Sequence, residues 1–279
     1  MSLGRRGLAS HFAVGLLAVS AGAGVTWLVK RPSPVVVTTH GEWVWVKKAA
    51  GDSVRAYVAY PERKDKAPAM VVIHEIFGLT EWEPTVADKL AGQGYVAIVP
   101  DMLSSRWGIT PPNPDSGRKL MAQLTPDGIT ADLDAAYDYV THLPSVKKDR
   151  VGVIGFCWGG GQTFRYATNN PKLKAAVVCY GPAPSLPAQA GQAPVVDTAA
   201  LGRIKASVLG VYGEADNRIN SMLPTVGQIM GQLGKKFAAD SYPGTGHGFL
   251  KPGRKGSDTD QVEKAWTKIQ GFLASNLAK

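Results

Sequence analysis

Five short runs of almost uninterrupted apolar residues limit what this chain can fold into more than any other feature of its sequence. They cover Ala69–His74, Tyr95–Pro100, Val151–Phe156, Ala175–Tyr180 and Ser207–Tyr212. Strands that are buried on both faces, as in a parallel sheet, have this pattern, whereas a strand with one wet face alternates apolar and polar residues. The runs therefore predict the central strands of a parallel sheet that is covered on both sides.

The segments between and around these runs predict the rest of the fold. Val35–Val46 and Ser53–Tyr60 alternate apolar and polar residues and predict an antiparallel pair, while Phe237–Tyr242 predicts a weaker last strand. Helical patterning covers Glu83–Gln93, Ile129–His142, Gly160–Asn169, Ile219–Leu233 and Thr259–Leu277. Strands that alternate with helices predict right-handed βαβ units and a doubly wound, mostly parallel sheet with helices on both faces. We expect one α/β domain over residues 35–279, with its ligand site at the carboxyl ends of the strands.

Residues 1–31 have the layout of an export segment. Arg5-Arg6 precede an uncharged, mainly apolar stretch over residues 12–29, and Ala21-Gly22-Ala23 offers a small-residue cleavage pattern. Arg5-Arg6 also loosely resembles a twin-arginine signal. The stretch is close to the roughly 20 residues of a helix that spans a bilayer. We therefore expect an export signal or an N-terminal membrane anchor, which would make a bacterial protein periplasmic or membrane-anchored.

The charge and the cysteines exclude several classes of function. The net charge of +9 is spread along the chain without a nucleic-acid-binding motif, which leaves attraction of acidic small molecules as the alternative to plain surface charge. Cys157 and Cys179 form neither a C-x-x-C pair nor a metal-ligand spacing. His74-Glu75 does not continue to H-E-x-x-H, because position 78 is Gly78. We expect no metal, cofactor or nucleic acid.

A nucleophile elbow follows the run Val151–Phe156. Gly155-Phe156-Cys157-Trp158-Gly159 has the pattern G-x-C-x-G, with a thiol where related enzymes carry a hydroxyl. The turn from strand to helix is so tight that side chains two residues on either side of Cys157 would collide. The amino end of the following helix directs free N–H groups and a positive dipole at the sulfur, which favours the thiolate.

The base and the acid that a cysteine nucleophile needs can be assigned from chain order. His247 lies in a glycine-rich loop after the last predicted strand, and Asp216 follows the run Ser207–Tyr212. Glu214 is the alternative acid. The order Cys157, Asp216, His247 is that of α/β-hydrolases, and each residue falls at the carboxyl end of a predicted strand. The oxyanion-hole N–H groups are expected from the backbone of Ile76 and Trp158, on position alone.

These residues resemble the dienelactone hydrolase (carboxymethylenebutenolidase) family over nearly the whole chain after residue 35. The most specific segments are 74–79 (HEIFGL), 155–160 (GFCWGG) and 246–249 (GHGF). The resemblance implies an α/β-hydrolase fold with a Cys157, His247, Asp216 triad. It also implies that Glu75 contacts the resting thiol and takes part in its activation when substrate binds. A nearby carboxylate opposes a second negative charge and so keeps the sulfur protonated.

The resemblance further implies a small-molecule substrate, an enol-lactone whose carboxylate is held by two basic residues. Lys251 matches the position of one, as lysine where the family has arginine, and Arg106 or Arg118 in the long loop Met102–Thr125 is the candidate for the other. Lysine binds a carboxylate as a point charge rather than as a fork. A broader esterase or thioesterase is therefore an alternative, and a non-catalytic exported binding protein on the same scaffold is a third.

Overall fold

The structure is a computed structural model, and it describes residues 38–187 and 194–277. The predicted export signal or anchor, residues 1–31, lies outside the described residues, as does the start of the first predicted strand. Among the described helices, none combines the length and the apolar character that crossing a bilayer requires.

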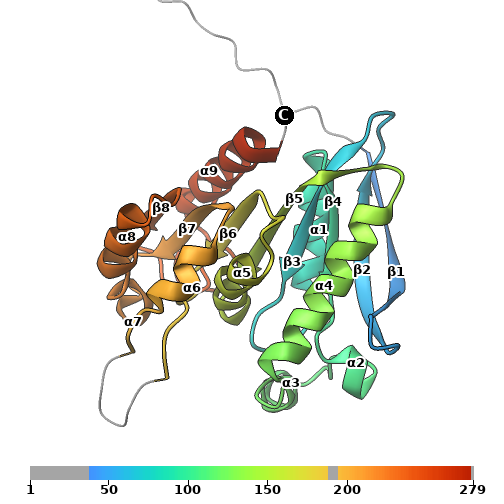
Figure 1. The fold of residues 1–279 in the computed structure, drawn as a ribbon, viewed down its shortest axis with the longest axis horizontal. Helices are drawn as coiled ribbons and strands as arrows, with labels where there is room; N and C mark the ends of the chain where they lie inside the picture. Colours follow the sequence, from blue (N-terminus) through green and yellow to red (C-terminus); the bar gives the residue numbers. More distant parts are fainter. Residues whose placement is uncertain (1–37, 188–193, 278–279) are drawn as a thin grey trace, which may run out of the picture. The chain divides into compact units, whose positions relative to one another are not determined.

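The described residues form an eight-stranded, mostly parallel sheet (Figure 1). β2 runs antiparallel to both of its neighbours, and every pair from β4 to β8 is parallel. This confirms the predicted fold class. In spatial order the strands are β1 (Thr39–Lys47), β2 (Ser53–Pro61), β4 (Val96–Pro100), β3 (Ala67–Ile73), β5 (Val146–Phe156), β6 (Ala175–Cys179), β7 (Ser207–Gly213) and β8 (Phe237–Tyr242).

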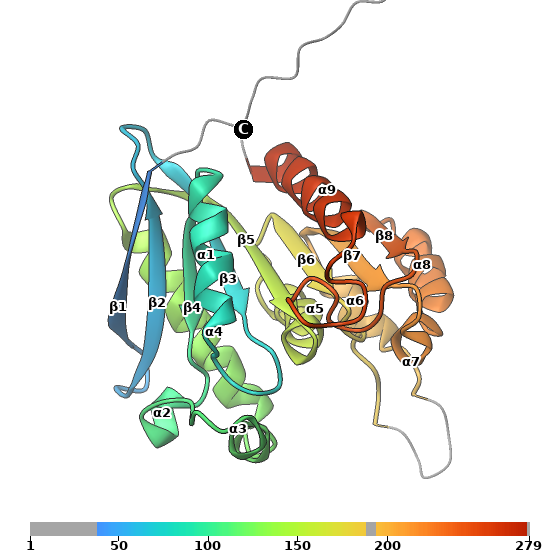
Figure 2. The ribbon, with the colours of Figure 1, turned by 180° about the vertical axis from the view of Figure 1, so that it is seen from behind.

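Helices cover both faces of the sheet. α1 (Trp82–Gly92) and α9 (Asp260–Leu277) lie on one face, and α4 (Pro126–His142) and α5 (Trp158–Asn169) lie on the other (Figures 1 and 2). Every residue of β3 and of β6 is buried, which explains why their sequences are almost entirely apolar. Burial of apolar surface contributes roughly 25 cal/mol per Å², so these covered strands supply much of the drive to fold.

One interruption divides a predicted helix into two. The single helix predicted over Ile219–Leu233 is wrong, because the chain forms α7 (Asn217–Asn220) and then α8 (Leu223–Gln232). Pro224 lies in the first turn of α8, where a missing N–H is tolerated, but in a continuous helix it would break a hydrogen bond and clash with the preceding turn. Both segments are nevertheless helical, as the sequence pattern predicts.

Three short helices were not predicted. α2 (Ser104–Trp107) and α3 (Pro114–Met121) lie in the long loop after β4, and α6 (Thr198–Arg203) precedes β7. α3 begins where the Asn113 side chain accepts a hydrogen bond from the Ser116 N–H at 3.0 Å. Such short elements depend on capping and on packing against the domain rather than on a periodic apolar face.

The topology gives the sheet two distinct edges. We call the edge at which β3 to β8 end the carboxyl edge, and the edge at which they begin the amino edge. α2 and α3 lie at the carboxyl edge, which is the lower edge in Figure 1. The elbow cysteine and the loops that follow β3 and β7 all lie at the carboxyl edge, where the sequence predicts the site.

Candidate active site

Cys157 lies in the sharp turn between β5 and α5. Its φ of 58° is in a region that residues other than glycine seldom adopt, a strain of roughly 1–3 kcal/mol that only a well-packed surrounding can maintain. Two glycines make the turn possible. A Cβ at Gly155 would lie 2.2 Å from the carbonyl oxygen of Gly159, and a Cβ at Gly159 would lie 2.4 Å from the carbonyl oxygen of His74. The Cys157 N–H donates to the Cys179 carbonyl at 3.0 Å, which ties the turn to β6.

The two thiols of the chain have different environments. Both are free, but Cys157 is half-buried whereas Cys179 is completely buried. Burial raises the pKa of the Cys179 thiol well above its usual value, so this thiol stays protonated. Cys157 occupies the N-cap position of α5, at the helix end where free N–H groups favour an anion. Cys157 is therefore the thiol that is suited to act as a nucleophile.

His247 is held between an acid and the thiol. Its Nδ1 lies 2.5 Å from Oδ2 of Asp216, a residue that is almost completely buried after β7. A hydrogen bond with the Cys157 side chain, and then the hydrogen bond and attraction of Asp216, raise the pKa of His247 to about 9, although burial opposes the rise. The structure thus brings together the three residues that the sequence predicts as a triad.

Glu214, the alternative acid, has a different position. It is exposed, and its Oε2 accepts a hydrogen bond from the Gly244 N–H at 3.1 Å. The loop that carries His247 also packs closely on the end of β7, where a Cβ at Gly213 would lie 2.3 Å from the Gly246 carbonyl oxygen. Glu214 therefore anchors the start of the histidine loop, while Asp216 binds the imidazole.

Glu75 follows β3 and forms a buried ion pair. Its Oε2 lies 2.9 Å from the Lys251 ammonium, and the two side chains are only 2% and 18% exposed. The same ammonium lies 3.4 Å from the Thr80 hydroxyl and 5.2 Å from the centroid of the Trp82 ring. Two residues that the sequence assigns to different tasks, thiol control and substrate binding, therefore contact each other.

Glu83 is a second buried carboxylate that sequence reasoning missed. It lies in α1 and is completely buried, and its oxygens accept hydrogen bonds from the Glu75 N–H at 3.4 Å and from the Thr80 N–H and hydroxyl at 2.9 and 2.6 Å. A buried carboxylate normally needs several such donors. Its position only three residues after Thr80, as in a capping box, was the available signal.

His74 fixes the loop that carries one of the expected oxyanion-hole amides. Its Nε2 accepts from the Met102 N–H at 3.2 Å, so Nδ1 carries the proton and donates to the Glu75 carbonyl at 2.8 Å. Ile76 follows directly. The His74 ring also stacks on Trp158 with the ring centroids 5.8 Å apart, and Trp158 begins α5, where helix amides lack intrahelical acceptors. His74 therefore supports both amide positions.

Comparison with known proteins identifies the family. The model of the dienelactone hydrolase family matches residues 54–277. The chain belongs to this family. A Synechocystis sp. protein named "Putative carboxymethylenebutenolidase" is 30% identical over an alignment of 232 residues that covers 80% of this chain and 92% of that protein. An Escherichia coli K12 protein of the same name is 33% identical over an alignment of 226 residues that covers 78% of this chain and 81% of that protein.

Solved structures agree with this assignment. A crystal structure from Klebsiella pneumoniae subsp. pneumoniae MGH 78578, whose name also refers to dienelactone hydrolase, is 26% identical and covers 85% of this chain and 99% of its own, with a TM-score of 0.73. A dienelactone hydrolase-like promiscuous phosphotriesterase from metagenomic libraries, 22% identical with a TM-score of 0.70, shares the fold. The fold and the membership of a hydrolase family are therefore both established.

The two arginines that are candidates for binding a substrate carboxylate contact other residues instead. Arg106 is exposed and lies 4.9 Å from the centroid of the Trp107 ring, and Arg118 pairs with Asp115 at 3.3 Å on the exposed side of α3. Within the described part of the chain, neither arginine forms a hydrogen bond or an ion pair with Cys157, Glu75 or His247. Arg254, which was not assigned to the site from the sequence, lies 6.0 Å from the centroid of the Phe77 ring, and Phe77 is two residues after Glu75.

Tyr180 is a further residue of the site that sequence reasoning missed. It follows β6, is completely buried and has a φ of 42°. Its ring centroid lies 5.2 Å from that of His247, in an edge-to-face arrangement. Burial raises the pKa of Tyr180 well above its usual value, so the hydroxyl stays neutral beside the imidazole. Nothing in the sequence except its place at the end of a buried run marked it.

Proposed function

We propose that this dienelactone hydrolase family member cleaves carboxylic esters or enol-lactones through a Cys157 nucleophile and a thioester intermediate. The observation that carries the proposal is the 2.5 Å hydrogen bond between His247 Nδ1 and Asp216, together with a Cys157 side chain close enough to the imidazole to raise its pKa. This is the arrangement of nucleophile, base and orienting acid that covalent acyl transfer needs.

The proposed reaction has two halves. His247 takes the proton of the Cys157 thiol, and the thiolate attacks the carbonyl carbon while the amides of Ile76 and Trp158 bind the oxyanion. The carbon–oxygen bond then breaks, and the imidazolium protonates the departing enolate or alcohol. In the second half His247 removes a proton from water, the hydroxide attacks the thioester, and the carbon–sulfur bond breaks. The imidazolium returns its proton to the thiolate.

The charges around the site act on the Cys157 thiol in opposite directions. A carboxylate such as that of Glu75 opposes a second negative charge in the same site, and the pairing of Glu75 with Lys251 reduces that opposition. We propose that Glu75 controls the thiol through its charge. Raising the pKa of His247 to about 9 favours the imidazolium that must form in each half of the reaction.

The pairing of Lys251 also supports a second candidate, a broader esterase that acts on neutral substrates. A substrate carboxylate would have to compete with Glu75 for this ammonium at 2.9 Å. A neutral ester avoids that competition. Arg106 and Arg118, which were expected to assist, contact Trp107 and Asp115 instead.

The test compares a carboxylated dienelactone with a neutral aryl ester. Wild type, Cys157→Ala and the matched control Cys179→Ala are assayed on both, and intact-mass spectra of quenched mixtures are searched for an acyl adduct. We expect turnover by wild type and by Cys179→Ala, an adduct on Cys157, and loss of turnover in Cys157→Ala. Residual turnover by Cys157→Ala at the wild-type rate would refute the mechanism. Turnover of the aryl ester alone would keep the mechanism and select the broader esterase.

A further inference from the structure

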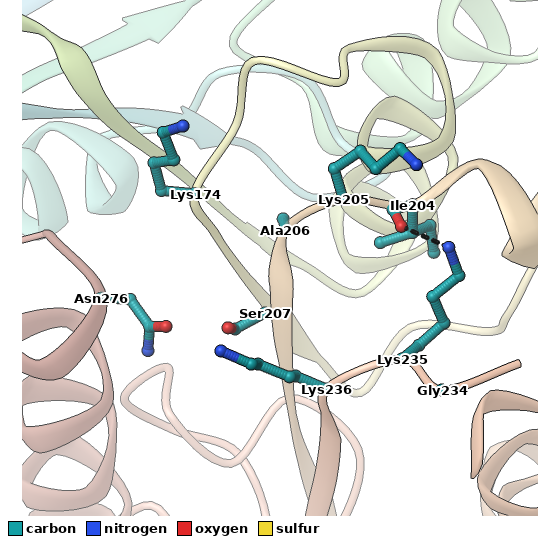
Figure 3. Close-up of a pocket in the computed structure, with 9 residues that line it drawn as sticks. All are labelled: Lys174, Ile204, Lys205, Ala206, Ser207, Gly234, Lys235, Lys236 and Asn276. Atoms are coloured by element: carbon teal, nitrogen blue, oxygen red, sulfur yellow. Dashed lines mark hydrogen bonds between the residues drawn. The ribbon is translucent and has the colours of Figure 1, made fainter.

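A lysine-rich hollow lies at the amino edge, on the opposite side of the sheet from Cys157. Its volume is about 390 Å³, and its lining comes from the loops that lead into β6, β7 and β8 and from the end of α9 (Figure 3). Lys174, Lys205, Lys235 and Lys236 line it, and no acidic residue is among the described residues that do so. Four like charges in one hollow repel one another, so the arrangement favours an anionic partner.

Three of these lysines are available to such a partner. Lys235 is occupied, because its ammonium donates to the carbonyls of Gly202 and Ile204 at 2.6 and 2.9 Å and so caps α6. Lys174, Lys205 and Lys236 are exposed, and within residues 38–187 and 194–277 none of the three belongs to an ion pair. Figure 3 shows the Lys235 bond to Ile204.

The positive charge continues along the same edge. A neighbouring hollow of about 420 Å³ is lined by Lys66, Lys147 and Lys148, where the chain enters β3 and β5. Asp149, which also lines it, lies 3.7 Å from the Arg150 guanidinium. The lysines therefore extend from β3 to β8, and a small anion in one hollow would leave most of them without a partner. A broad anionic surface would meet them together.

The chain also enters the domain at this edge. β1 begins at Thr39 and is antiparallel to β2, which is antiparallel to β4, so β1 starts at the edge where the parallel strands start. The Thr38 carbonyl accepts from the Glu62 N–H at 2.7 Å, at the end of β2. In the sequence, residues 30–38 separate the apolar stretch of residues 12–29 from the start of β1.

We propose that the amino edge docks on an anionic lipid surface, with Lys174, Lys205 and Lys236 as its main contacts. The apolar segment would bring the domain to a bilayer, and the lysines add electrostatic attraction to anionic lipids at its surface. In this orientation the carboxyl edge, with Cys157, faces away from the lipid and stays open to substrate. The proposal does not depend on which ester the site cleaves.

The test uses the full chain and a matched set of substitutions. The edge variant carries Lys174→Gln, Lys205→Gln and Lys236→Gln, and the control carries Lys47→Gln, Lys119→Gln and Lys264→Gln, so both lose three charges. Partition onto neutral phosphatidylcholine vesicles and onto vesicles with phosphatidylglycerol is measured by flotation at low and high salt, with thermal unfolding by circular dichroism as the check on folding.

We expect the wild type and the control to bind vesicles with phosphatidylglycerol more tightly than neutral vesicles. This excess binding should decrease at high salt, which screens the charges. Each lysine near an anionic membrane strengthens binding by roughly fivefold, so the edge variant should lose about a hundredfold of the excess. Binding to neutral vesicles should be equal for all three proteins. The proposal would be overturned if the wild type showed no preference for phosphatidylglycerol vesicles, or if the control variant lost as much of that preference as the edge variant. It would also be overturned if millimolar glycerol phosphate, at constant ionic strength, displaced the wild type from these vesicles.

Discussion

Replacement of Lys251 by methionine tests how the buried charges of the site are balanced. Methionine keeps most of the apolar stem, so the change removes the ammonium with little loss of volume. Glu75 then loses a partner at 2.9 Å while its side chain remains 2% exposed. The neighbouring carboxylate of Glu83 stays in place and cannot replace the lost cation.

The expected cost follows from this burial. Removing one partner of a buried ion pair destabilises a protein by about 3–5 kcal/mol, because the other charge remains without compensation. Since the Lys251 side chain is 18% exposed, the pair is not fully dry and we expect the lower end, about 3 kcal/mol. At roughly 2–4 °C per kcal/mol for a domain of this size, the Tm should fall by about 6–12 °C.

Replacement of the other member of the ion pair, Glu75, should destabilise the protein less. Glu75→Gln keeps an oxygen that accepts from the Lys251 ammonium, which also has the Thr80 hydroxyl at 3.4 Å and some contact with solvent. We expect about 1 kcal/mol, typical of a weakened hydrogen bond. In the double variant neither charge is left alone, so the two changes should show a coupling of about 2 kcal/mol.

Urea unfolding followed by tryptophan fluorescence measures all three variants. Lys264→Met is the matched control, because Lys264 pairs with Asp260 at 2.7 Å on the exposed surface of α9, with side chains 59% and 67% exposed. Exposed pairs contribute about 0–1 kcal/mol. The reasoning is refuted if Lys251→Met costs no more than this control, or if the changes at Glu75 and Lys251 are additive.

The imidazole and the elbow give two further tests. Asp216→Asn should lower the pKa of His247 from about 9, though not to its ordinary value, since the bond to Cys157 is the larger cause, and an NMR titration of the ring protons checks this. Because the folded-state pKa is raised, the stability that His247 contributes is complete below about pH 6.5 and is lost as the pH rises through about 9, so the free energy of unfolding should fall across that window. Gly159→Ala should destabilise the fold by more than about 2 kcal/mol, since its Cβ would lie 2.4 Å from a backbone oxygen, whereas Gly227→Ala in α8 meets nothing within 4 Å and should be neutral or stabilise by up to about 1 kcal/mol. Equal melting temperatures for the two alanine variants would contradict the packing argument.

The sequence predicted the parts of the fold that repeat a simple pattern. β8 coincides with the predicted strand Phe237–Tyr242, and β6 differs from its predicted bounds by one residue. Apolar runs and chain order also predicted the fold class and the region of the site, because the carboxyl ends of parallel strands meet at one edge. β5 begins five residues before its predicted start, since Lys147–Arg150 extend the strand beyond the layer that the helices cover.

The sequence could not predict contacts between residues that are far apart in the chain. Glu75 and Lys251 are 176 positions apart, and no local pattern indicates that one neutralises the other. Glu83 appears from the sequence as an ordinary charged residue of an amphipathic helix, yet it is completely buried. Tyr180 is indistinguishable from the rest of its apolar run until the structure gives its φ of 42° and its contact with His247.

The ion pair also explains why motifs alone do not define the substrate of this family member. Lys251 already binds Glu75, so a lactone carboxylate that took the ammonium would leave Glu75 without a cation, while its backbone N–H faces the buried carboxylate of Glu83. Binding an anion is therefore opposed unless another cation compensates. Arg254, whose guanidinium lies 6.0 Å from the centroid of the Phe77 ring, is a candidate for that cation. A neutral ester meets no such opposition. The preference between lactone and ester thus depends on a balance among groups brought together by folding from β3, α1 and the loop after His247.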